Sequence, residues 1–288
     1  MEFIIDTNFH DVRLDKFLRK TYQNIPVSGI FKMIRKGNVK VNKKKKKQNY
    51  RLQAGDVVRV WEASAPTAAE PLPQLSANEK EFIQSCIVFE NNDLILCNKP
   101  PGMVMHAGSS HEQGLSELVK AYTENRAFSF VHRIDKMTSG LVLGAKNLST
   151  ARKLSDLIHK RKIKKIYIVL VEGKVEKNHF KLENFLKKEL TRVVVHPDNQ
   201  NGAKEACSEF TILKRGRQRT LLKAELHTGR THQLRVQLAH VNHPIVGDQK
   251  YGKKQHQKRM YLLSQRLIIP ALNFDFTLPV PESFYAAL

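Results

Sequence analysis

The longest strictly apolar run in the chain spans only Ile166 to Val171, and it constrains the fold more than any other feature. A bilayer span needs roughly 20 apolar residues, so this run is too short to cross a membrane. A short run of branched and aromatic residues bounded by polar ones is typical of a β-strand that is buried on both faces. The sequence therefore predicts a sheet at the centre of a folded domain and excludes a membrane-spanning protein.

Basic residues dominate the charge balance. The 288 residues include 49 Lys and Arg against 27 Asp and Glu, a formal net charge of +22. Such an excess predicts a polyanionic partner, with nucleic acid first and an anionic membrane surface second. Hydrophobic residues make up 41% of the chain, which is too many for a disordered basic tail. Most of the chain is therefore expected to fold.

Cysteine usage and the N-terminus both indicate a cytoplasmic protein. The three cysteines, Cys86, Cys97 and Cys207, cannot form a paired disulfide framework and lack metal-ligand spacing. We expect them to be reduced thiols in the core. The first residues, Met1 to Asp6, are acidic too early for a secretory signal.

A stretch rich in Ala and Pro, Ala63 to Pro73, divides the chain and has the composition of a linker. Residues 1–62 hold 15 Lys and Arg against 6 Asp and Glu, and the remaining 226 residues hold 34 against 21. The N-terminal part is thus more than twice as basic per residue. We expect one domain over residues 1–62, a linker over 63–80 and a larger domain over 81–288.

The N-terminal part has the pattern of two helices followed by a short sheet. Apolar residues from Leu14 to Tyr22 fall at helical spacing on one face. Ser28 is a candidate N-cap for a second helix that Gly37 would end. Residues 38–42 alternate like a strand, and residues 55–60 have the pattern of another.

Between these two strands lie five consecutive lysines, Lys43 to Lys47. One interpretation is a solvated, flexible loop, and the other is a surface that contacts phosphates. Basic residues that converge on the same end of the predicted module favour the second interpretation. The residues expected to contact a polyanion are Arg35, Lys36, Lys40, Lys43, Lys44 and Lys45.

In the larger domain, a cluster of polar residues separates two apolar strands. Phe130 and Val131 end the first strand, and Leu141 to Leu143 belong to the second. The cluster between them consists of His132, Arg133, Asp135, Thr138, Ser139 and Gly140. A rigid scaffold presents catalytic groups in this way, although spacing alone also fits a salt-bridged loop. Tyr167, in the apolar run, is either a core residue or an aromatic platform at a cavity.

The segment from Leu226 to His240 predicts a turn that leads into a helix. Residues 228–231, Thr-Gly-Arg-Thr, fit the turn, and Leu234 and Leu238 fit the inner face of the helix. Arg230 would then lie near the helix N-terminus, an end that attracts anions. The histidines nearby are His227, His232, His240 and His243. No Glu or Cys joins them at zincin spacing and their neighbours are basic, so we expect no metal.

The N-terminal segments resemble the S4-like RNA-binding domain. The similarity lies in Arg13 to Lys20, Ser28 to Asn42 and Ala54 to Val60. It implies a compact module of helices and strands that holds structured RNA by its backbone. Gly29 stands where that family commonly has an arginine, so the lysine run would carry more of the affinity.

The larger domain resembles the RluA family of pseudouridine synthases from about Ile87 to Leu267. The resemblance rests on four ordered motifs, which are Ile87 to His106, His132 to Gly140, Thr228 to Gln233, and Pro244 to Gly252. It implies an α+β fold: a catalytic domain with a mixed, mainly antiparallel sheet, flanking helices and a central cleft (the pseudouridine synthase fold), plus the small α/β S4-like domain. It also implies that uridine in RNA is isomerised to pseudouridine without a cofactor. The N-glycosidic bond breaks, uracil rotates and a C–C bond forms.

The resemblance assigns catalytic roles as well. Asp135 matches the family's catalytic aspartate, and Arg230 matches the arginine that would keep this carboxylate ionised and aimed. Tyr167 matches the tyrosine that supports the uracil face and assists the final deprotonation. The target nucleotide must flip out of any helix, and Arg133 would fill the gap that it leaves. The expected substrate-binding residues are His132, Arg133, Thr138 and Leu262.

Three functions stay open at this point. The preferred one is an RNA pseudouridine synthase acting on large-subunit ribosomal RNA, because in this family an appended S4-like domain is associated with ribosomal RNA more than with transfer RNA. The second is a transfer RNA pseudouridine synthase. The third is a non-catalytic RNA-binding or ribosome-assembly factor on the same scaffold. In each case we expect a monomer whose partner is structured RNA.

Overall fold

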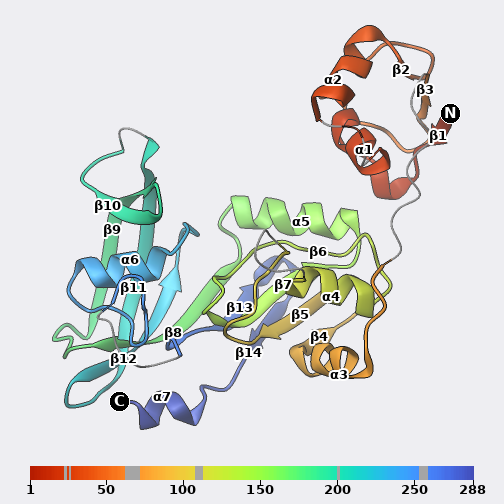
Figure 1. Ribbon diagram of the computed structural model, residues 1–288. Coiled ribbons are helices and arrows are strands. Elements are labelled where there is room, and N and C mark those ends of the chain that lie inside the picture. The colour runs from red at the N-terminus through yellow and green to blue at the C-terminus, as the bar shows by residue number, and fades with distance from the viewer. Residues whose placement is uncertain (23–24, 26, 62–71, 108–112, 200–201, 253–258) are drawn as a thin grey trace. The chain divides into compact units, whose positions relative to one another are not determined.

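The computed structural model describes residues 1–22, 25, 27–61, 72–107, 113–199, 202–252 and 259–288 (Figure 1). The chain forms two compact units, one of Met1–Gln74 and one of Leu75–Lys146 with Thr150–Leu288. Of the segment expected as a linker, residues 63–71 lie outside the described residues. Its last residues, 77–80, are helical, because Ser76 and Glu79 form a reciprocal capping box that starts a helix at Ala77.

The first unit is a pair of helices against a small sheet. Its elements are β1 (Glu2–Ile4), the 3₁₀ turn η1 (Thr7–Phe9), α1 (Leu14–Thr21), α2 (Val27–Lys36), β2 (Val39–Val41) and β3 (Val57–Val60). The sheet has the order β1-β3-β2 and both pairings are antiparallel. Apolar residues of both helices pack on the sheet, among them Leu14, Leu18 and Ile30, each with no exposed surface.

Two details of this unit differ from the sequence-based expectation. Strand β1 carried no clear sequence signal, because its three residues form an edge strand that depends on pairing with β3. Ser28 is not the cap of α2, since that helix already begins at Val27 and Ser28 lies in its first turn. The end of α2 is as expected: Gly37 follows it with φ of +82°, a conformation that disfavours side chains.

The second unit is built on one large sheet. Its strands are β4 (Ile87–Glu90), β5 (Leu94–Lys99), β6 (Ser129–Phe130), β7 (Ser139–Ala145), β8 (Lys164–Glu172), β9 (His179–Glu189), β10 (Arg192–His196), β11 (Lys204–Arg215), β12 (Arg219–Leu226), β13 (Leu262–Ile269) and β14 (Phe274–Thr277). Its helices are α3 (Ala77–Cys86), α4 (Leu115–Tyr122), α5 (Leu148–His159), α6 (Gln233–His240), η3 (Pro270–Leu272) and α7 (Glu282–Ala286). None of the helices in the described residues is long and apolar enough to cross a membrane.

The sheet is mixed and mainly antiparallel, as expected. Its order is β10-β9-β11-β12-β8-β13-β7-β5-β4, with β14 paired to β13 and β6 to β7. Among the described pairings, only β13 and β7 run parallel. Alternate residues of β5 face opposite layers: Leu94 and Leu96 pack in the cluster that includes Leu154 of α5, and Ile95 and Cys97 pack against α3 and α4. The central strands are therefore covered on both faces, which explains their continuous apolar character.

The parallel pairing of β7 with β13 brings three segments together: β8, β13 and the polar loop that precedes β7. Strand β8 pairs with β13, and β13 pairs with the start of β7, where the polar loop of residues 131–138 ends. Gly140 has φ of +107°, and a Cβ at this position would lie 2.3 Å from the carbonyl oxygen of Ser264. The close approach of the two strands therefore depends on glycine at position 140.

Candidate active site

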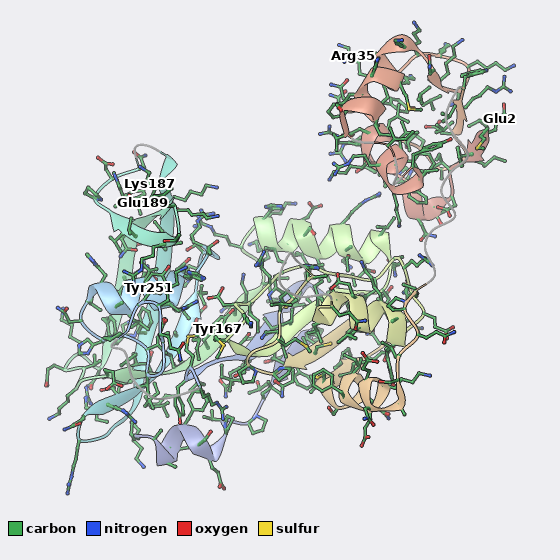
Figure 2. All side chains as sticks on the ribbon, viewed as in Figure 1. Glu2, Arg35, Tyr167, Lys187, Glu189 and Tyr251 are labelled. Carbon is green, nitrogen blue, oxygen red and sulfur yellow. The ribbon has the colours of Figure 1, made fainter. Side chains whose placement is uncertain are left out.

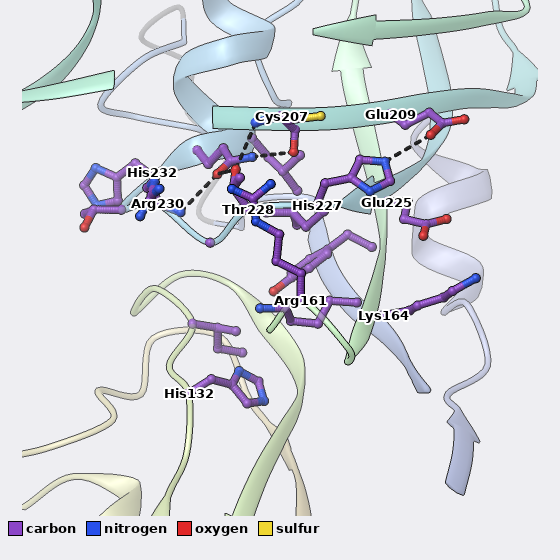
Figure 3. A pocket seen from close by; sticks show the side chains of 18 of the residues that line it. His132, Arg161, Lys164, Cys207, Glu209, Glu225, His227, Thr228, Arg230 and His232 are labelled. Carbon is purple, nitrogen blue, oxygen red and sulfur yellow. Dashed lines mark hydrogen bonds and ion pairs between the residues drawn. The ribbon is translucent and has the colours of Figure 1, made fainter. Parts of the chain in front are cut away.

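A cleft of about 1230 Å³ opens in the second unit, between the loop before β7 and the segment that leads into α6. Its walls include every catalytic and substrate-binding residue that the sequence predicted, namely His132, Arg133, Asp135, Thr138, Tyr167, Arg230 and Leu262. Figure 3 shows His132 on one side of this cleft and Thr228, Arg230 and His232 on the other. Segments that lie up to 130 residues apart in the chain thus meet at one place.

Backbone hydrogen bonds and a buried lysine hold the loop that carries Asp135. The Thr138 amide donates to the Asp135 carbonyl at 3.1 Å, which closes a turn. The Lys99 ammonium has no exposed surface and donates to the carbonyls of Lys136, Pro100 and Met103 at 3.0, 2.8 and 3.0 Å. Burial lowers the pKa of Lys99 to about 8. The sequence analysis did not select this residue, although a lysine at the end of an apolar strand was a signal for it.

Asp135 is paired with Arg235 rather than with Arg230. A guanidinium nitrogen of Arg235 donates to Asp135 Oδ2 at 3.1 Å, and the Asp135 side chain keeps 26% of its surface exposed to the cleft. Arg230 Nε instead donates to the Glu205 carbonyl at 2.8 Å. The expectation that Arg230 holds Asp135 is therefore wrong. Arg230 precedes α6 and reaches β11, whereas Arg235 lies in the first turn of the helix.

A second carboxylate fixes the orientation of Arg235. Nε and Nη2 of Arg235 donate to the two carboxylate oxygens of Asp248 at 2.8 and 2.9 Å, so the two side chains form a bidentate ion pair. The side chains of Arg235 and Asp248 are only 9% and 1% exposed. Burial opposes both charges, but the pair lowers the pKa of Asp248 and raises the pKa of Arg235, with Asp135 adding to the latter. The site therefore presents one aimed carboxylate, Asp135, beside a permanent positive charge.

The sequence held a signal for Arg235 that went unused. Residues 233–238 of α6 are all buried, so this helix is covered on every side. A charged residue in such a helix is paired almost without exception. Its partner Asp248 also occurs in a segment that the sequence analysis had quoted as a motif.

His232 is a second neighbour of the Asp135 carboxylate, and Tyr251 contacts His232 from the other side. His232 caps α6 in the left-handed conformation, with φ of +55°. Its Nδ1 lies 2.8 Å from the Tyr251 hydroxyl, which accepts the Val193 amide at 3.0 Å. The hydroxyl proton is thus available to Nδ1, and the opposite nitrogen, Nε2, lies 3.8 Å from Asp135 Oδ2. Burial lowers the pKa of His232, which favours the neutral ring.

Tyr167 presents a neutral phenol to the cleft. The residue is 8% exposed and lies in β8 opposite Ala224 on one side and Ser264 on the other. Burial raises the pKa of Tyr167 to about 12; a hydrogen bond with Ser264 partly opposes this shift and the charge of Asp135 adds to it. Leu262, 4% exposed, belongs to the same apolar cluster as Tyr167. Figure 2 labels Tyr167 near the middle of the second unit.

The remaining predicted residues differ in how free they are to meet a substrate. His132 Nε2 accepts the Leu143 amide at 3.1 Å, so this nitrogen holds the loop. Burial, followed by the charge of Lys165, lowers the pKa of His132 to about 3. Thr138 is 2% exposed, whereas Arg133 is exposed at the cleft. Arg133 is therefore the residue of this group with the most freedom to contact RNA.

The far wall of the cleft carries histidines and carboxylates. Glu209 lies between two of them, with oxygens 3.1 Å from His179 Nε2 and 3.0 Å from His227 Nε2. Figure 3 shows the pair of His227 and Glu209. Among the residues that the structure describes, no group of three or more His, Cys, Asp or Glu side chains could hold a metal ion.

The predicted RNA-contacting residues of the first unit lie at the end of α2, in β2 and directly after β2. Arg35, Lys36 and Lys43 to Lys45 are exposed, and Lys40 is partly buried. A Cβ at Gly37 would overlap the Lys45 side chain. The side chain of Lys45 therefore lies against Gly37, the residue that follows α2. Figure 2 shows Arg35 at the surface of this unit.

Comparison with known proteins agrees with this fold. A family model described as RNA pseudouridylate synthase matches residues 93–240, and one described as S4 domain matches residues 12–58. The chain is similar to ribosomal large subunit pseudouridine synthase C of Vibrio cholerae, with 37% identity over 98% of this chain and 90% of that protein. For the same protein of Buchnera aphidicola, identity is 37% over 96% and 89%.

The fold is also shared with a solved human structure, RNA Pseudouridylate Synthase Domain Containing 4. The TM-score is 0.63 at 19% identity, covering 74% of this chain and 97% of that one. The fold, taken with the family matches and the relatives of 37% identity, is that of an RNA-modifying α+β enzyme with an appended S4 module. This chain belongs to the RNA pseudouridylate synthase family and carries an N-terminal S4 domain. Both expectations of the sequence analysis about family and fold class are confirmed.

Proposed function

We propose that this enzyme forms pseudouridine in large-subunit ribosomal RNA and that Asp135 is its reacting carboxylate. The observation that carries the proposal is the position of Asp135, exposed to a large cleft and held by Arg235, which Asp248 in turn orients. Such an arrangement keeps one carboxylate charged and aimed before substrate arrives. Binding RNA alone has no need of a carboxylate that is held in this way at the wall of a cleft.

The surrounding residues fit the steps of the isomerisation. The reaction breaks the N-glycosidic bond, rotates uracil and forms a C–C bond. It requires a charged carboxylate near the sugar and base, and Asp135 supplies this group. Tyr167 enters as a neutral phenol because its pKa is about 12, so it supports the uracil ring and does not serve as a phenolate base at pH 7. Leu262 adds apolar contact beside it. Arg133, exposed at the cleft, is placed to hold the flanking backbone of a flipped nucleotide.

Ribosomal RNA is favoured as the substrate by two observations. The two bacterial relatives with 37% identity are named for the ribosomal large subunit and align over nearly the whole chain. The S4 domain adds a basic surface made of exposed Arg35, Lys36 and Lys43 to Lys45 together with the partly buried Lys40. Such a surface suits the phosphate backbone of a structured RNA. A cytoplasmic location and a monomeric state belong to the same proposal.

Two variants of Asp135 test the proposal. Asp135→Asn preserves the shape of the side chain and removes the charge, and Asp135→Ala removes the group altogether. Pseudouridines would be mapped in ribosomal and transfer RNA from cells that lack the protein and are supplied with the wild type or either variant. We expect specific sites in large-subunit ribosomal RNA to lose pseudouridine with both variants, while RNA binding persists.

Each alternative has its own outcome in this experiment. If pseudouridine is lost only from transfer RNA, the substrate is transfer RNA and not ribosomal RNA. If the Asp135→Asn variant restores full modification, the Asp135 carboxylate does not take part in the reaction. If the wild type binds ribosomal particles but restores no pseudouridine, the protein is an assembly factor on an inherited scaffold.

A further inference from the structure

The small sheet of the first unit has one face in the core and one face open. Val39, Val41, Val58 and Val60 point into the core and are at most 3% exposed. Side chains alternate between the two faces of a strand, so the neighbours of these valines point the other way. On that open face, Ile4 is 79% exposed and Trp61, directly after β3, is 38% exposed. Trp61 is the only tryptophan of the chain.

Two cations lie over the ring of the partly exposed indole, in the geometry of cation–π contacts. Arg59 is two residues before Trp61 on the same strand and is the register partner of Lys40 in β2. The Lys40 ammonium lies 5.2 Å from the centroid of the Trp61 ring, and the Arg59 guanidinium carbon lies 5.6 Å from it. Arg59 also forms an ion pair with Glu2 of β1. The Trp61 amide donates to the Asn38 carbonyl at 2.8 Å, which fixes the backbone beneath the ring.

This grouping has the chemistry of a nucleotide-binding platform. Single-stranded nucleic acids stack their bases on aromatic rings that reach a protein surface, and cations near such a ring strengthen the binding. A cation next to the ring can bind the phosphate of the same nucleotide. Because Arg59 is already paired with Glu2, Lys40 is the cation with its charge available for phosphate.

We propose that Trp61, with Lys40 and Arg59, forms a stacking site for an unpaired base of the RNA substrate. The inference rests on the proposed function, because it assumes that RNA is the partner. It adds a second mode of contact to the S4 domain: the lysine run and the end of α2 meet the phosphate backbone, whereas the open sheet face holds a base.

Intrinsic fluorescence tests the site directly, because every tryptophan signal of this chain comes from Trp61. The full-length protein would be titrated with a short oligouridylate and, separately, with an RNA hairpin stem whose two strands are joined by a non-nucleotide linker, so that every base is paired. Binding of both RNAs would be followed independently by anisotropy of a label on the RNA. We expect the single strand to quench Trp61 saturably in step with binding, and the hairpin stem to bind with little quenching.

Two substitutions and one matched control complete the test. Trp61→Ala is expected to weaken oligouridylate binding about five- to hundredfold, the range that loss of one base–aromatic stack produces. Trp61→Phe should retain most of the affinity because a phenyl ring still stacks. Tyr285→Ala removes another exposed aromatic residue, 47% exposed in α7, and should leave binding unchanged.

The outcomes separate this inference from the proposed function. If oligouridylate binds without altering Trp61 fluorescence, or if Trp61→Ala binds as the wild type does, the stacking site does not exist, and the role of Asp135 is untouched. If no RNA binds the wild type at all, both the stacking site and the proposed substrate class fail. Equal quenching by the hairpin stem would also overturn the assignment to an unpaired base.

Discussion

Replacing Arg235 by alanine should damage both the stability and the activity of the second unit. The substitution leaves Asp248, 1% exposed, with only the amides of Lys250 and Tyr251 as hydrogen-bond donors. Removing one partner of a buried ion pair costs about 3–5 kcal/mol, since the other charge stays buried. At about 2–4 °C per kcal/mol for a domain of this size, Tm should fall by roughly 6–20 °C.

The loss of activity follows from the same contacts. Without Arg235, Asp135 loses its hydrogen bond of 3.1 Å and its nearest fixed positive charge. A misplaced catalytic group commonly costs on the order of 100-fold in rate. Arg235→Lys keeps a charge but cannot form the bidentate pair with Asp248 and still reach Asp135, so it should fold better than the alanine variant and remain strongly impaired.

Urea unfolding and pseudouridine formation on ribosomal RNA fragments would measure the two effects, with Arg230→Ala as the matched control. Arg230 makes a hydrogen bond to the Glu205 carbonyl from a partly exposed position, so its loss should cost under about 1 kcal/mol. The reasoning is refuted if Arg235→Ala keeps wild-type stability and rate while Arg230→Ala loses activity. Arg230, and not Arg235, would then support Asp135 during turnover.

Three further predictions concern protonation and salt. His132 becomes protonated below about pH 6.5 in the unfolded chain but only near pH 3 in the folded one, so the folded state loses stability as the pH falls from 6.5 toward 3. At pH 5 the loss should be about 2 kcal/mol. Urea unfolding should show this pH dependence in the wild type and a weaker one in His132→Gln. Because the pKa of Tyr167 is about 12, Tyr167→Phe should lower the rate of pseudouridine formation but leave a pH–rate profile parallel to that of the wild type from pH 7 to 10. If the wild-type rate changes with pH in this range and the rate of the variant does not, Tyr167 titrates there and the neutral phenol is refuted. Replacing Lys43, Lys44 and Lys45 by alanine should reduce the slope of log K against log salt for RNA binding by roughly 2–3, and an unchanged slope would show that these lysines do not meet phosphates.

Local patterns in the sequence were enough to locate the elements around the site. The apolar run at Tyr167 is part of β8, as predicted, and the polar cluster around Asp135 is a loop before β7, except that Ser139 and Gly140 already belong to that strand. Leu234 and Leu238 are buried in α6, 4% and 0% exposed, although the helix is covered on every side rather than on one inner face. These features depend on residues close in the chain, where periodicity and turn chemistry decide the conformation.

By itself, the sequence determined the family and the fold class and singled out Asp135 as the candidate carboxylate, because motifs and periodicity are local properties. Only the tertiary structure decided which arginine meets Asp135. Arg230 and Arg235 are five residues apart, and the choice between them depends on where α6 begins and on Asp248, which arrives from another loop. The exposure of Trp61 was likewise invisible in sequence, because it depends on which face of a three-stranded sheet the helices cover. Contacts between distant segments are set by packing of the whole chain, and no short window of residues contains that information.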